Sequence, residues 1–522
     1  MIKEDVLRQI GQLMVFGFYG EQMTPELKEM IDRYQVGNII LFSRNLSNPQ
    51  QIRRLTVELQ TEARNAGHRR PLLICTDQEN GAVRRLGAGA VALPGAMLLG
   101  ATRQTDYAYE VAAMTAAELR SVGINWNLAP VVDVNNNPEN PVIGTRSFGS
   151  DPRAVAAMGA AFMRGLQDNG TVSTLKHFPG HGDTGTDSHL DLPVIRHDLK
   201  RLEQIELPAF RHCIDAGAEV VMSAHIFFPA LENRCGVPAT LSRNILTGLL
   251  REHLRFRGVI TTDCLEMRAI ADRFGTARGA VMALQAGADL VMVSHTYERQ
   301  RETLAKVYRA VVDGTLAVGA LERSLQRIGR LKARYLDWND ALNVRPLPDD
   351  VLQRYRKRAA HIRRQGVTLV NQQGLPLDCN KRTLFIDAAS RTVSNVEDRA
   401  TAFSTACAII KAVNPLAEFV SLAGTAVEAL IDRLKERAYQ AVVVVTRSIE
   451  RDRSRSDLVR RIAAASPCPL VALAGKSPYD LRLFERTVAS ICTYDFDAGA
   501  LADAVRTLFG LEKVSGSLPV NF

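Results

Sequence analysis

The sequence predicts an α/β protein in which an N-terminal (β/α)8 barrel of the TIM type is followed by a smaller α/β domain. Three observations support this prediction: the length of 522 residues, eight short apolar runs that alternate with amphipathic stretches, and a second series of such runs after a proline-containing linker. Eight strands that alternate with helices over about 300 residues are typical of a closed barrel. A chain of this length is also expected to hold more than one domain.

The eight expected barrel strands are runs rich in β-branched and apolar residues, and helical patterns separate them. The stretch before the fourth run, DYAYEVAAMTAAELRSVG, ends at Gly123, a residue suited to a helix C-terminal cap. We therefore expect a barrel within residues 1–336. Its predicted strands occupy residues 12–18, 36–42, 71–77, 124–134, 171–178, 218–226, 258–263 and 288–294.

The second domain is expected to begin after a linker and a connecting helix at residues 337–365. The segment NDALNVRPLPDD combines two prolines with mixed polar residues, as linkers do. The α/β rhythm then resumes and predicts a smaller open α/β domain with a mostly parallel sheet over residues 366–522. Its predicted strands occupy residues 383–388, 418–424, 441–448, 469–475 and 489–496.

Composition and charge exclude several classes of protein. Hydrophobic residues make up 46% and charged residues 23%, which is ordinary for a globular protein. The net charge of +9 arises from 65 basic and 56 acidic residues that are interleaved, so no nucleic-acid partner is expected, and the basic stretch 353–364 is interpreted as the solvated face of a helix. No apolar run approaches the roughly 20 residues that span a bilayer, so no membrane partner is expected.

The first residues and the cysteines indicate a cytoplasmic protein. Glu4 and Asp5 precede a short apolar run without a small-residue cleavage pattern, so a secretory signal is not expected. The eight cysteines occur singly with no CxxC pair, as expected for reduced thiols. The sequence leaves the oligomeric state open.

Polar residues follow the predicted barrel strands at the ends where barrels place their reactive groups. A single surface loop could carry one such residue by chance, but these residues follow several strands and are expected to converge on one rim of the barrel. They are Asp77, Gln78 and Glu79 after the third strand, Asp133 and later Arg146 after the fourth, Lys176 and His177 at the fifth, His225 at the sixth and Asp263 at the seventh.

The loop after the fifth strand, KHFPGHGDTGTDSHLDLP, holds three histidines and three aspartates. Pro179 and Gly180 separate His177 from His181 and prevent the helical turn that commonly places such a pair on one metal. No cysteine is nearby, so no metal site is expected. For His181 and Asp183 we expect hydrogen bonds that hold the loop.

Asp187 and His189 form a tighter unit in the same loop. An aspartate two residues before a histidine can bind one ring nitrogen and tune the other for proton transfer, as a general acid/base requires. Asp263 follows an almost purely β-branched run and is costly there unless it faces a polar barrel mouth. We interpret it as a nucleophile or as an ion-pair partner of Lys176 or Arg146.

Long strings of this sequence resemble glycoside hydrolase family 3, in particular its β-N-acetylhexosaminidase branch of cell-wall recycling. The strings are KHFPGHGDT..DSH, DQE.G.V.RL, NPVIGTRSFG and PATLSRNILTGLLREHLRFRGVITTDCLEM in the barrel. In the second domain, KSPYDLRLF and SGSLPV are similar to the α/β/α sandwich of that family.

The resemblance implies that Asp263 is the nucleophile and that His189 is the acid/base with Asp187 as its dyad partner. It further implies sugar binding in the minus-one subsite by Asp77, Arg85, Arg146, Lys176 and His177. The mechanism uses side chains alone, so no cofactor is expected. One departure is Asn80, which stands where the family often has a glycine, and we expect it to affect the backbone beside the subsite.

The expected function is retaining, exo-acting release of terminal N-acetylglucosamine from muropeptides or chitooligosaccharides, which are small-molecule carbohydrate substrates. A phosphorylase of the same linkage is an alternative, because a histidine acid/base does not repel an anionic acceptor. A β-glucosidase or β-xylosidase is another, although the resemblance places the acid/base of those branches in the second domain. A non-catalytic sugar sensor would need neither a nucleophile nor a proton shuttle.

Overall fold

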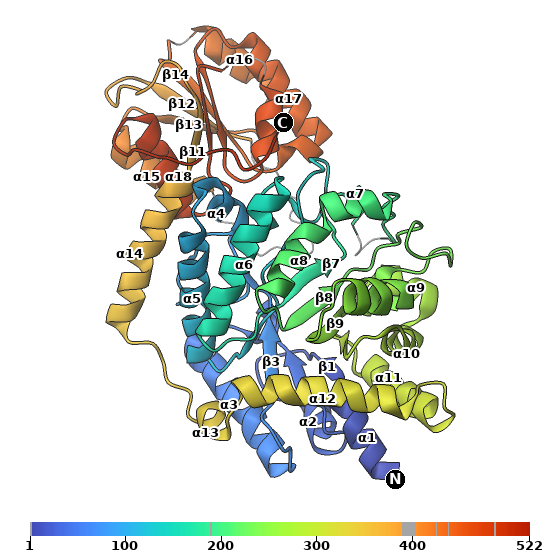
Figure 1. The fold of residues 1–522 in the computed structure, drawn as a ribbon. Helices are drawn as coiled ribbons and strands as arrows, with labels where there is room; N and C mark the ends of the chain where they lie inside the picture. Colours follow the sequence, from blue (N-terminus) through green and yellow to red (C-terminus); the bar gives the residue numbers. More distant parts are fainter. Residues whose placement is uncertain are drawn as a thin grey trace.

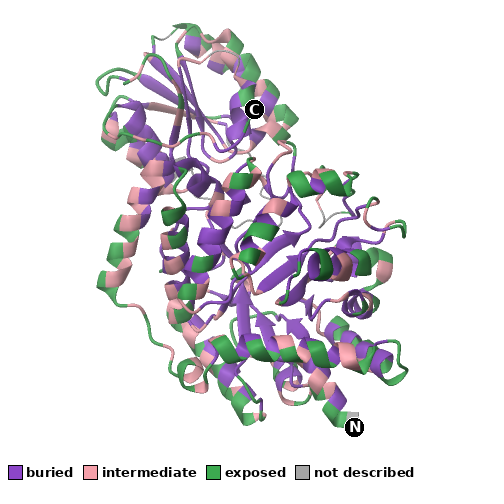
Figure 2. Ribbon diagram, viewed as in Figure 1, coloured by how far each residue is buried: buried purple, intermediate pink, exposed green. Residues whose placement is uncertain are grey.

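A computed structural model describes residues 3–187, 191–388, 403–423, 425–436, 438–484 and 487–521. Figure 1 shows an N-terminal barrel below a smaller C-terminal domain, with α14 running alongside the barrel toward the upper domain. Both sheets are buried, while the helices around them carry exposed outer faces (Figure 2). Among the described residues, no helix has the length and apolar character that crossing a membrane requires.

The barrel is an eight-stranded sheet in which every neighbouring pair of strands is parallel. Two parallel bridges, Trp126 to Val172 and Val131 to Lys176, join the segments of β6 and β7, the two ends of the strand order, and close the sheet. Each of the eight predicted runs coincides with one strand, with β9 extending one residue past its run, so the predicted barrel is confirmed. The strands are β1 (Met14–Phe16), β2 (Asn38–Ile40), β3 (Leu73–Thr76), β6 (Trp126–Asn127), β7 (Leu175–Phe178), β8 (Val220–Ser223), β9 (Val259–Cys264) and β10 (Leu290–Val293).

Helices around the barrel begin where the sequence supplies a polar cap. Thr24, Asn48 and Asp151 each accept a backbone N–H through the side chain, and a proline follows each of them at the start of the helix. The outer helices are α1 (Lys3–Gly11), α2 (Pro25–Asp32), α3 (Pro49–Asn65), α5 (Thr105–Ser121), α6 (Pro152–Asp168), α8 (Leu207–Asp215), the π-helix η4 (Asn244–His253), α10 (Thr276–Ala286), α11 (Tyr297–Val312) and α12 (Val318–Tyr335).

Several shorter elements lie in the loops that follow the strands. After β3 the chain forms a hairpin of β4 (Gln78–Asn80) and β5 (Val83–Arg84) and then α4 (Ala96–Thr102). The 3-10 helix η2 (Gly144–Arg146) lies after β6, α7 (Leu199–Gln204) follows the loop after β7, and α9 (Arg268–Phe274) follows β9. These excursions shape the carboxyl end of the barrel.

The second domain is a six-stranded sheet between two helical layers, which confirms the α/β/α sandwich. Its strand order is β11-β16-β15-β14-β12-β13, with β12 (Thr383–Asp387), β13 (Glu418–Ser421), β14 (Ala441–Thr446), β15 (Leu470–Ala474) and β16 (Ala489–Cys492) all parallel. One apolar core lies between the sheet and helices α15 (Phe403–Val413) and α18 (Ala498–Leu508), and another lies against α16 (Val427–Glu436) and α17 (Arg453–Ala465).

One strand of this sheet was not predicted from the sequence. β11 (Thr368–Gln372) pairs antiparallel with β16 at the edge of the sheet. Its residues alternate between buried or half-buried and exposed positions and include Asn371 and Gln372. A short edge strand with polar residues lacks the continuous apolar run of a central parallel strand.

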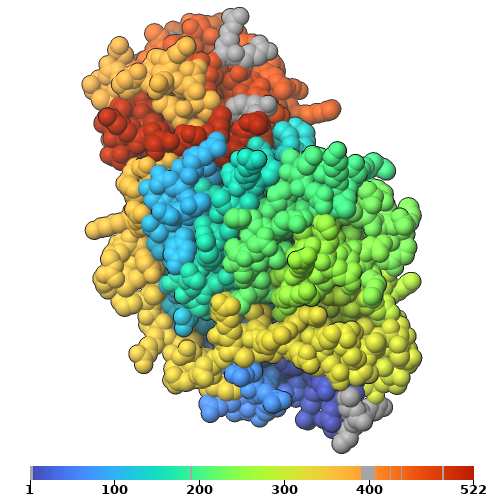
Figure 3. Space-filling view, viewed as in Figure 1, coloured from blue at the N-terminus to red at the C-terminus, as the bar shows by residue number. Residues whose placement is uncertain are grey.

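The connection between the domains runs along the barrel surface through α13 (Trp338–Leu342) and α14 (Asp349–Gly366), coloured yellow in Figure 3. Met97 and Leu98 of α4 share an apolar core with Tyr479 and Tyr494 of the second domain. Polar contacts reach the loop between β6 and η2, where Asn135 Nδ2 donates to the Tyr479 hydroxyl over 3.0 Å. The guanidinium of Arg451 also donates to the Asn140 carbonyl, so the second domain contacts the loop that leads to Arg146 on η2.

Candidate active site

A pocket of about 430 Å³ opens at the carboxyl end of the barrel and is lined by side chains that follow several different strands. Six of the eight site residues predicted from the sequence line it. They are Asp77 and Arg85 after β3, Arg146 on η2, Lys176 and His177 of β7, and Asp263 of β9. The strand ends thus bring residues as far apart in sequence as Asp77 and Asp263, which are separated by 186 positions, into one pocket.

A buried ion cluster forms one wall of this pocket. The Lys176 ammonium donates to Asp77 Oδ1 at 2.7 Å and lies 2.6 Å from Glu79 Oε1. Glu79 in turn accepts two hydrogen bonds from the Arg146 guanidinium, from Nε and from Nη2, each over 2.8 Å. The cluster therefore alternates in charge, from Asp77 through Lys176 and Glu79 to Arg146.

Each charge in the cluster stabilises its neighbours. Burial alone would raise the pKa of Glu79, but the charges of Arg146 and Lys176 hold that pKa well below its usual range. Burial alone would lower the pKa of Lys176, but Asp77 and Glu79 raise it. Glu79 and Lys176 therefore stay charged at neutral pH, and this wall presents fixed charges to the pocket.

Asp133 organises the loop on the next side of the pocket. Its carboxylate accepts a hydrogen bond from Nδ1 of His177 at 2.8 Å and one from the His181 backbone N–H at 2.7 Å. This partner fixes the tautomer of His177 and leaves Nε2 as the nitrogen available to a substrate. The pKa of Asp133, which burial would raise, is lowered by the neighbouring histidines.

Asp263 lies near the end of β9, where the strand reaches the pocket. Its Oδ1 accepts the backbone N–H of Cys264 at 2.6 Å. His225 fixes the same stretch of backbone, because its Nε2 lies 2.9 Å from the Cys264 carbonyl while its Nδ1 contacts the Thr240 hydroxyl at 2.8 Å. The Asp263 carboxylate is thereby held at a defined position on the pocket wall.

The two members of the predicted dyad, Asp187 and His189, are not among the six site residues that line the pocket in the described part of the chain. Asp187 lies in the loop after β7 and is not among the residues that line the pocket. His189 lies outside the described residues. In the same loop, His181 contacts the Thr184 hydroxyl at 2.8 Å and Asp183 contacts His197 at 2.5 Å, which are the loop-holding contacts expected of them.

Asn80 adopts the backbone conformation that a glycine favours. Its φ is +69°, in the left-handed region that asparagine tolerates better than most residues. The side chain donates to the Thr115 hydroxyl at 2.9 Å. Gly81 follows with φ +57°, where a Cβ would come within 2.8 Å of the Gly95 backbone. The turn beside Asp77 is therefore kept with asparagine at this position.

Sequence reasoning assigned no role to several residues that matter in the structure. Glu79 and Asp133 were recognised only as polar residues after strands, because their bridging contacts depend on side chains distant in sequence. Arg44 after β2 and His295 after β10 also line the pocket. Their position after predicted strands was the signal that would have identified them.

One group of potential metal ligands was found among the described residues. Cys264, Glu266 and His295 each offer a ligand atom, and these atoms lie within 4.8 Å of one another. Cys264 and His295 line the pocket as well. The loop after β7, where the sequence first raised the question of a metal, contributes none of the three.

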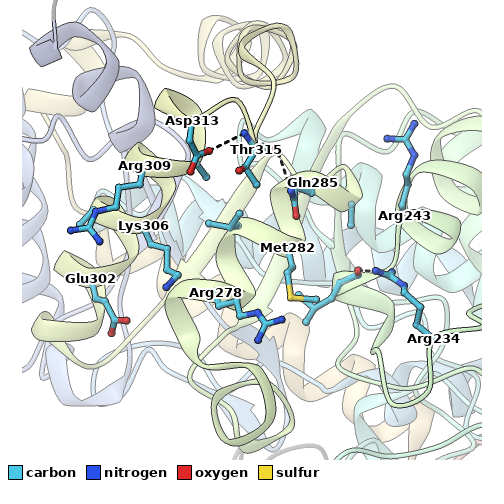
Figure 4. Close-up of a pocket in the computed structure, with 15 residues that line it drawn as sticks. Arg234, Arg243, Arg278, Met282, Gln285, Glu302, Lys306, Arg309, Asp313 and Thr315 are labelled. Carbon is cyan, nitrogen blue, oxygen red and sulfur yellow. Dashed lines mark hydrogen bonds between the residues drawn. The ribbon is translucent and has the colours of Figure 1, made fainter.

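A larger hollow, of about 760 Å³, lies on the outer wall of the barrel. Figure 4 shows side chains of α10 and α11 around it, among them Arg278, Met282, Lys306 and Arg309. None of the predicted site residues lines this hollow. We place the candidate active site at the barrel mouth, because the buried ion cluster and the strand ends converge there.

A β/α barrel whose acidic and basic side chains converge at the carboxyl ends of its strands has the arrangement of a barrel enzyme. Residues 5–331 match the family model described as the glycosyl hydrolase family 3 N terminal domain. The chain belongs to glycoside hydrolase family 3, which confirms the resemblance noted in the sequence.

Curated relatives support this assignment. A beta-hexosaminidase A of Pseudoalteromonas piscicida is 37% identical over 387 residues, which are 70% of this chain and 64% of that protein. A beta-hexosaminidase of Stenotrophomonas maltophilia strain R551-3 is 34% identical over 336 residues, which are 63% of this chain and 94% of that protein. The second match shows that a protein of nearly barrel length exists among the relatives.

Solved structures match both domains. A family 3 beta-N-acetylglucosaminidase from Paenibacillus sp. str. FPU-7 has a TM-score of 0.90 at 36% identity, over 99% of this chain and 98% of that one. A fungal multi-domain family 3 beta-N-acetylglucosaminidase has a TM-score of 0.92 at 37% identity, over 98% of this chain. This chain spans 60% of that fungal chain.

Proposed function

We propose that this protein is a retaining exo-β-N-acetylglucosaminidase. The observation that carries the proposal is the convergence on one pocket of Asp263 and the buried cluster of Asp77, Lys176 and Arg146. The volume of about 430 Å³ lies in the lower part of the range of roughly 300–1,000 Å³ for small-molecule sites. Such a pocket suits one terminal sugar ring and therefore an exo mode of action.

The proposed binding roles follow from the fixed polar groups. Asp77 and Lys176 hold each other at 2.7 Å and present an acceptor and a donor to adjacent sugar hydroxyls. Arg146 and Arg85 add donors, and His177 offers Nε2 because Asp133 occupies Nδ1. Groups held in advance lose little freedom when the sugar binds.

The proposed reaction proceeds in two displacements. An oxygen of Asp263 attacks the anomeric carbon, the glycosidic bond breaks, and the leaving oxygen takes a proton from His189. His189 then removes a proton from water, whose oxygen attacks the same carbon and releases the Asp263 carboxylate. Two inversions give retention. Asp187 is the proposed partner that favours the protonated form of His189.

The proposed substrates are muropeptides or chitin-derived oligosaccharides with a terminal β-linked N-acetylglucosamine. The names of relatives at 34–37% identity support this sugar. The proposed catalytic unit is the barrel, residues 1–336, since all eight proposed site residues fall within it. Residues 337–365 are the proposed linker and connecting helix, and the proposed sandwich domain is 366–522.

A chromogenic N-acetyl-β-glucosaminide, assayed with and without inorganic phosphate, tests the proposal. We expect free N-acetylglucosamine under both conditions and much slower cleavage of the matching β-glucoside. The Asp263→Asn variant is the matched control for contaminating activity. Release of a sugar 1-phosphate would assign the protein as a phosphorylase instead, and binding of the sugar without turnover would indicate a sensor.

A further inference from the structure

We propose that Cys264, Glu266 and His295 form a binding site for one thiophilic divalent cation, such as Zn²⁺, on the wall of the active-site pocket, and that the bound ion inhibits the enzyme. The ion is not part of the proposed reaction. The inference therefore goes beyond the proposed function and describes an additional site next to it.

The geometry is the first argument. Cys264 ends β9, Glu266 follows it, and His295 follows the neighbouring strand β10, so two adjacent strand ends supply the three side chains. A thiolate, an imidazole and a carboxylate are the three ligand types that zinc binds in proteins. Their ligand atoms lie within 4.8 Å of one another, whereas neighbouring ligands of a tetrahedral zinc lie about 3.5 Å apart. Small side-chain rotations would close the site.

The second argument is that the backbone of the site is fixed before any ion binds. Glu266 accepts the backbone N–H of His295 at 2.6 Å and that of Thr296 at 3.1 Å, which ties the β9 loop to the β10 loop. The ring of His295 packs beside Phe42 at a centroid distance of 5.2 Å. Supporting contacts of this kind are what orient metal ligands.

The surroundings determine which ions fit. The Arg44 side chain donates to the Ser294 carbonyl at 2.8 Å, beside His295, and its positive charge opposes any cation, so an ion must bind the three ligands strongly to occupy the site. A sulfur ligand disfavours hard ions such as Mg²⁺ and Ca²⁺. Binding forms a metal–sulfur bond and releases the thiol proton of Cys264 to solvent, with no change in oxidation state.

The position of the site explains the expected inhibition. Cys264 and His295 line the same pocket as Asp263, and the Cys264 backbone N–H binds Asp263 Oδ1 at 2.6 Å. An ion on this wall occupies space beside the proposed nucleophile and attracts its negative charge. Both effects oppose attack on the sugar.

The test titrates the full-length protein with Zn²⁺, and in parallel with Mg²⁺, while turnover of the chromogenic substrate is followed. We expect Zn²⁺ to inhibit and excess chelator to restore activity, whereas Mg²⁺ has no effect. Cys264→Ser and His295→Gln should each weaken zinc inhibition by at least about tenfold, since even outer partners of a metal are worth roughly 10- to 100-fold. Cys235→Ser and Cys379→Ser are the matched controls, because both thiols are exposed and distant in sequence from the site.

A spectroscopic measurement keeps the metal site separate from the proposed activity. Co²⁺ bound to the wild-type protein should give a thiolate-to-cobalt absorption band that Cys264→Ser removes and the two control variants keep. Equal zinc inhibition in wild type and in a folded Cys264→Ser would overturn the proposal, as would Co²⁺ binding without the band. If Cys264→Ser does not fold, His295→Gln tests the proposal instead. We expect this variant to bind Co²⁺ more weakly, as measured by titrating the same absorption band. An inactive protein that still shows the band would instead contradict the proposed function.

Discussion

Nδ1 of His177, a residue of β7, donates a hydrogen bond over 2.8 Å to Asp133 in the segment that follows β6. The same carboxylate accepts the backbone N–H of His181. One buried charge thus fixes both the ring of a proposed sugar ligand and the start of the loop that leads to Asp187 and His189. Asp133 is a positioning residue, because it acts through His177.

The first prediction concerns Asp133→Asn. An amide has one oxygen where the carboxylate has two, so it cannot accept all of these N–H groups. We expect the variant to lose about 2–4 kcal/mol of unfolding free energy, since each lost hydrogen bond to a charged group costs about 1.5–3 kcal/mol. KM for the chromogenic substrate should rise. Asp183→Asn is the control, because its partner His197 is partly exposed and outside the pocket, and a KM equal to wild type in Asp133→Asn would contradict the role.

The second prediction concerns Glu79→Gln. The substitution leaves Lys176 and Arg146 with one carboxylate fewer in a buried site, and breaking a buried ion pair typically costs about 3–5 kcal/mol. Urea denaturation should show this loss. Glu110→Gln is the matched control, because Glu110 pairs with Arg358 at a half-exposed surface position and should change stability by at most about 1 kcal/mol. Equal losses of unfolding free energy in the two variants would show that Glu79 does not bridge Lys176 and Arg146 in the way proposed.

The third prediction concerns Asp263 as the proposed nucleophile. Asp263→Ala should abolish glycosyl transfer while circular dichroism stays native, because the side chain serves chemistry at the pocket wall. A fluorinated substrate should leave a covalent sugar on Asp263, detected by mass spectrometry of the digested protein. A label on another carboxylate would reassign the nucleophile.

The fourth prediction concerns His189→Ala. The hydrolysis rate of natural disaccharides should fall far more than that of activated nitrophenyl substrates. A nitrophenolate can leave without being protonated, whereas a sugar alkoxide cannot. General acid catalysis is commonly worth about 100- to 10,000-fold, and the loss on natural substrates should fall in that range. Asp187→Asn should show the same pattern in milder form. Equal losses on both substrate types would point to binding or folding instead.

The fifth prediction concerns Glu118, which is buried on α5 and accepts the Val91 backbone N–H at 2.7 Å. Burial raises the pKa of Glu118 from 4.5 to about 7. The native state therefore holds this proton when the unfolded state has lost it, and stability falls as pH rises from about 4.5 to 7. Glu118→Gln keeps the acceptor oxygen and removes the charge.

We expect Glu118→Gln to match wild type near pH 4.5 and to exceed it at pH 8, by at most about 3 kcal/mol. Denaturant unfolding at the two pH values measures the difference. Glu110→Gln serves again as the control and should show no such gain. A Glu118 variant less stable than wild type at pH 8 would mean that the carboxylate has a stabilising partner.

The sequence predicted the barrel well because each strand lies in a mostly apolar run that polar residues follow. The same regularity located Asp77, Arg146, Lys176, His177 and Asp263 at one rim. The pattern could not reveal that Glu79 lies between Lys176 and Arg146, because this depends on which side chains turn toward each other in space. β11 was missed because Asn371 and Gln372 interrupt its short run, which therefore lacks the apolar pattern of the strands that were predicted.

The contact between the second domain and the loop between β6 and η2 links the stability of that domain to the order of the pocket. Asn140 anchors the turn that leads to Arg146, since its Oδ1 accepts the backbone N–H of Val142 at 2.9 Å and of Ile143 at 2.8 Å. Arg451 of the second domain holds the carbonyl of that same asparagine. Heat or denaturant that loosens the sandwich removes this contact, and we expect the turn and the adjoining pocket to lose order. We therefore expect loss of activity to accompany melting of the smaller domain, although that domain contains none of the proposed catalytic residues.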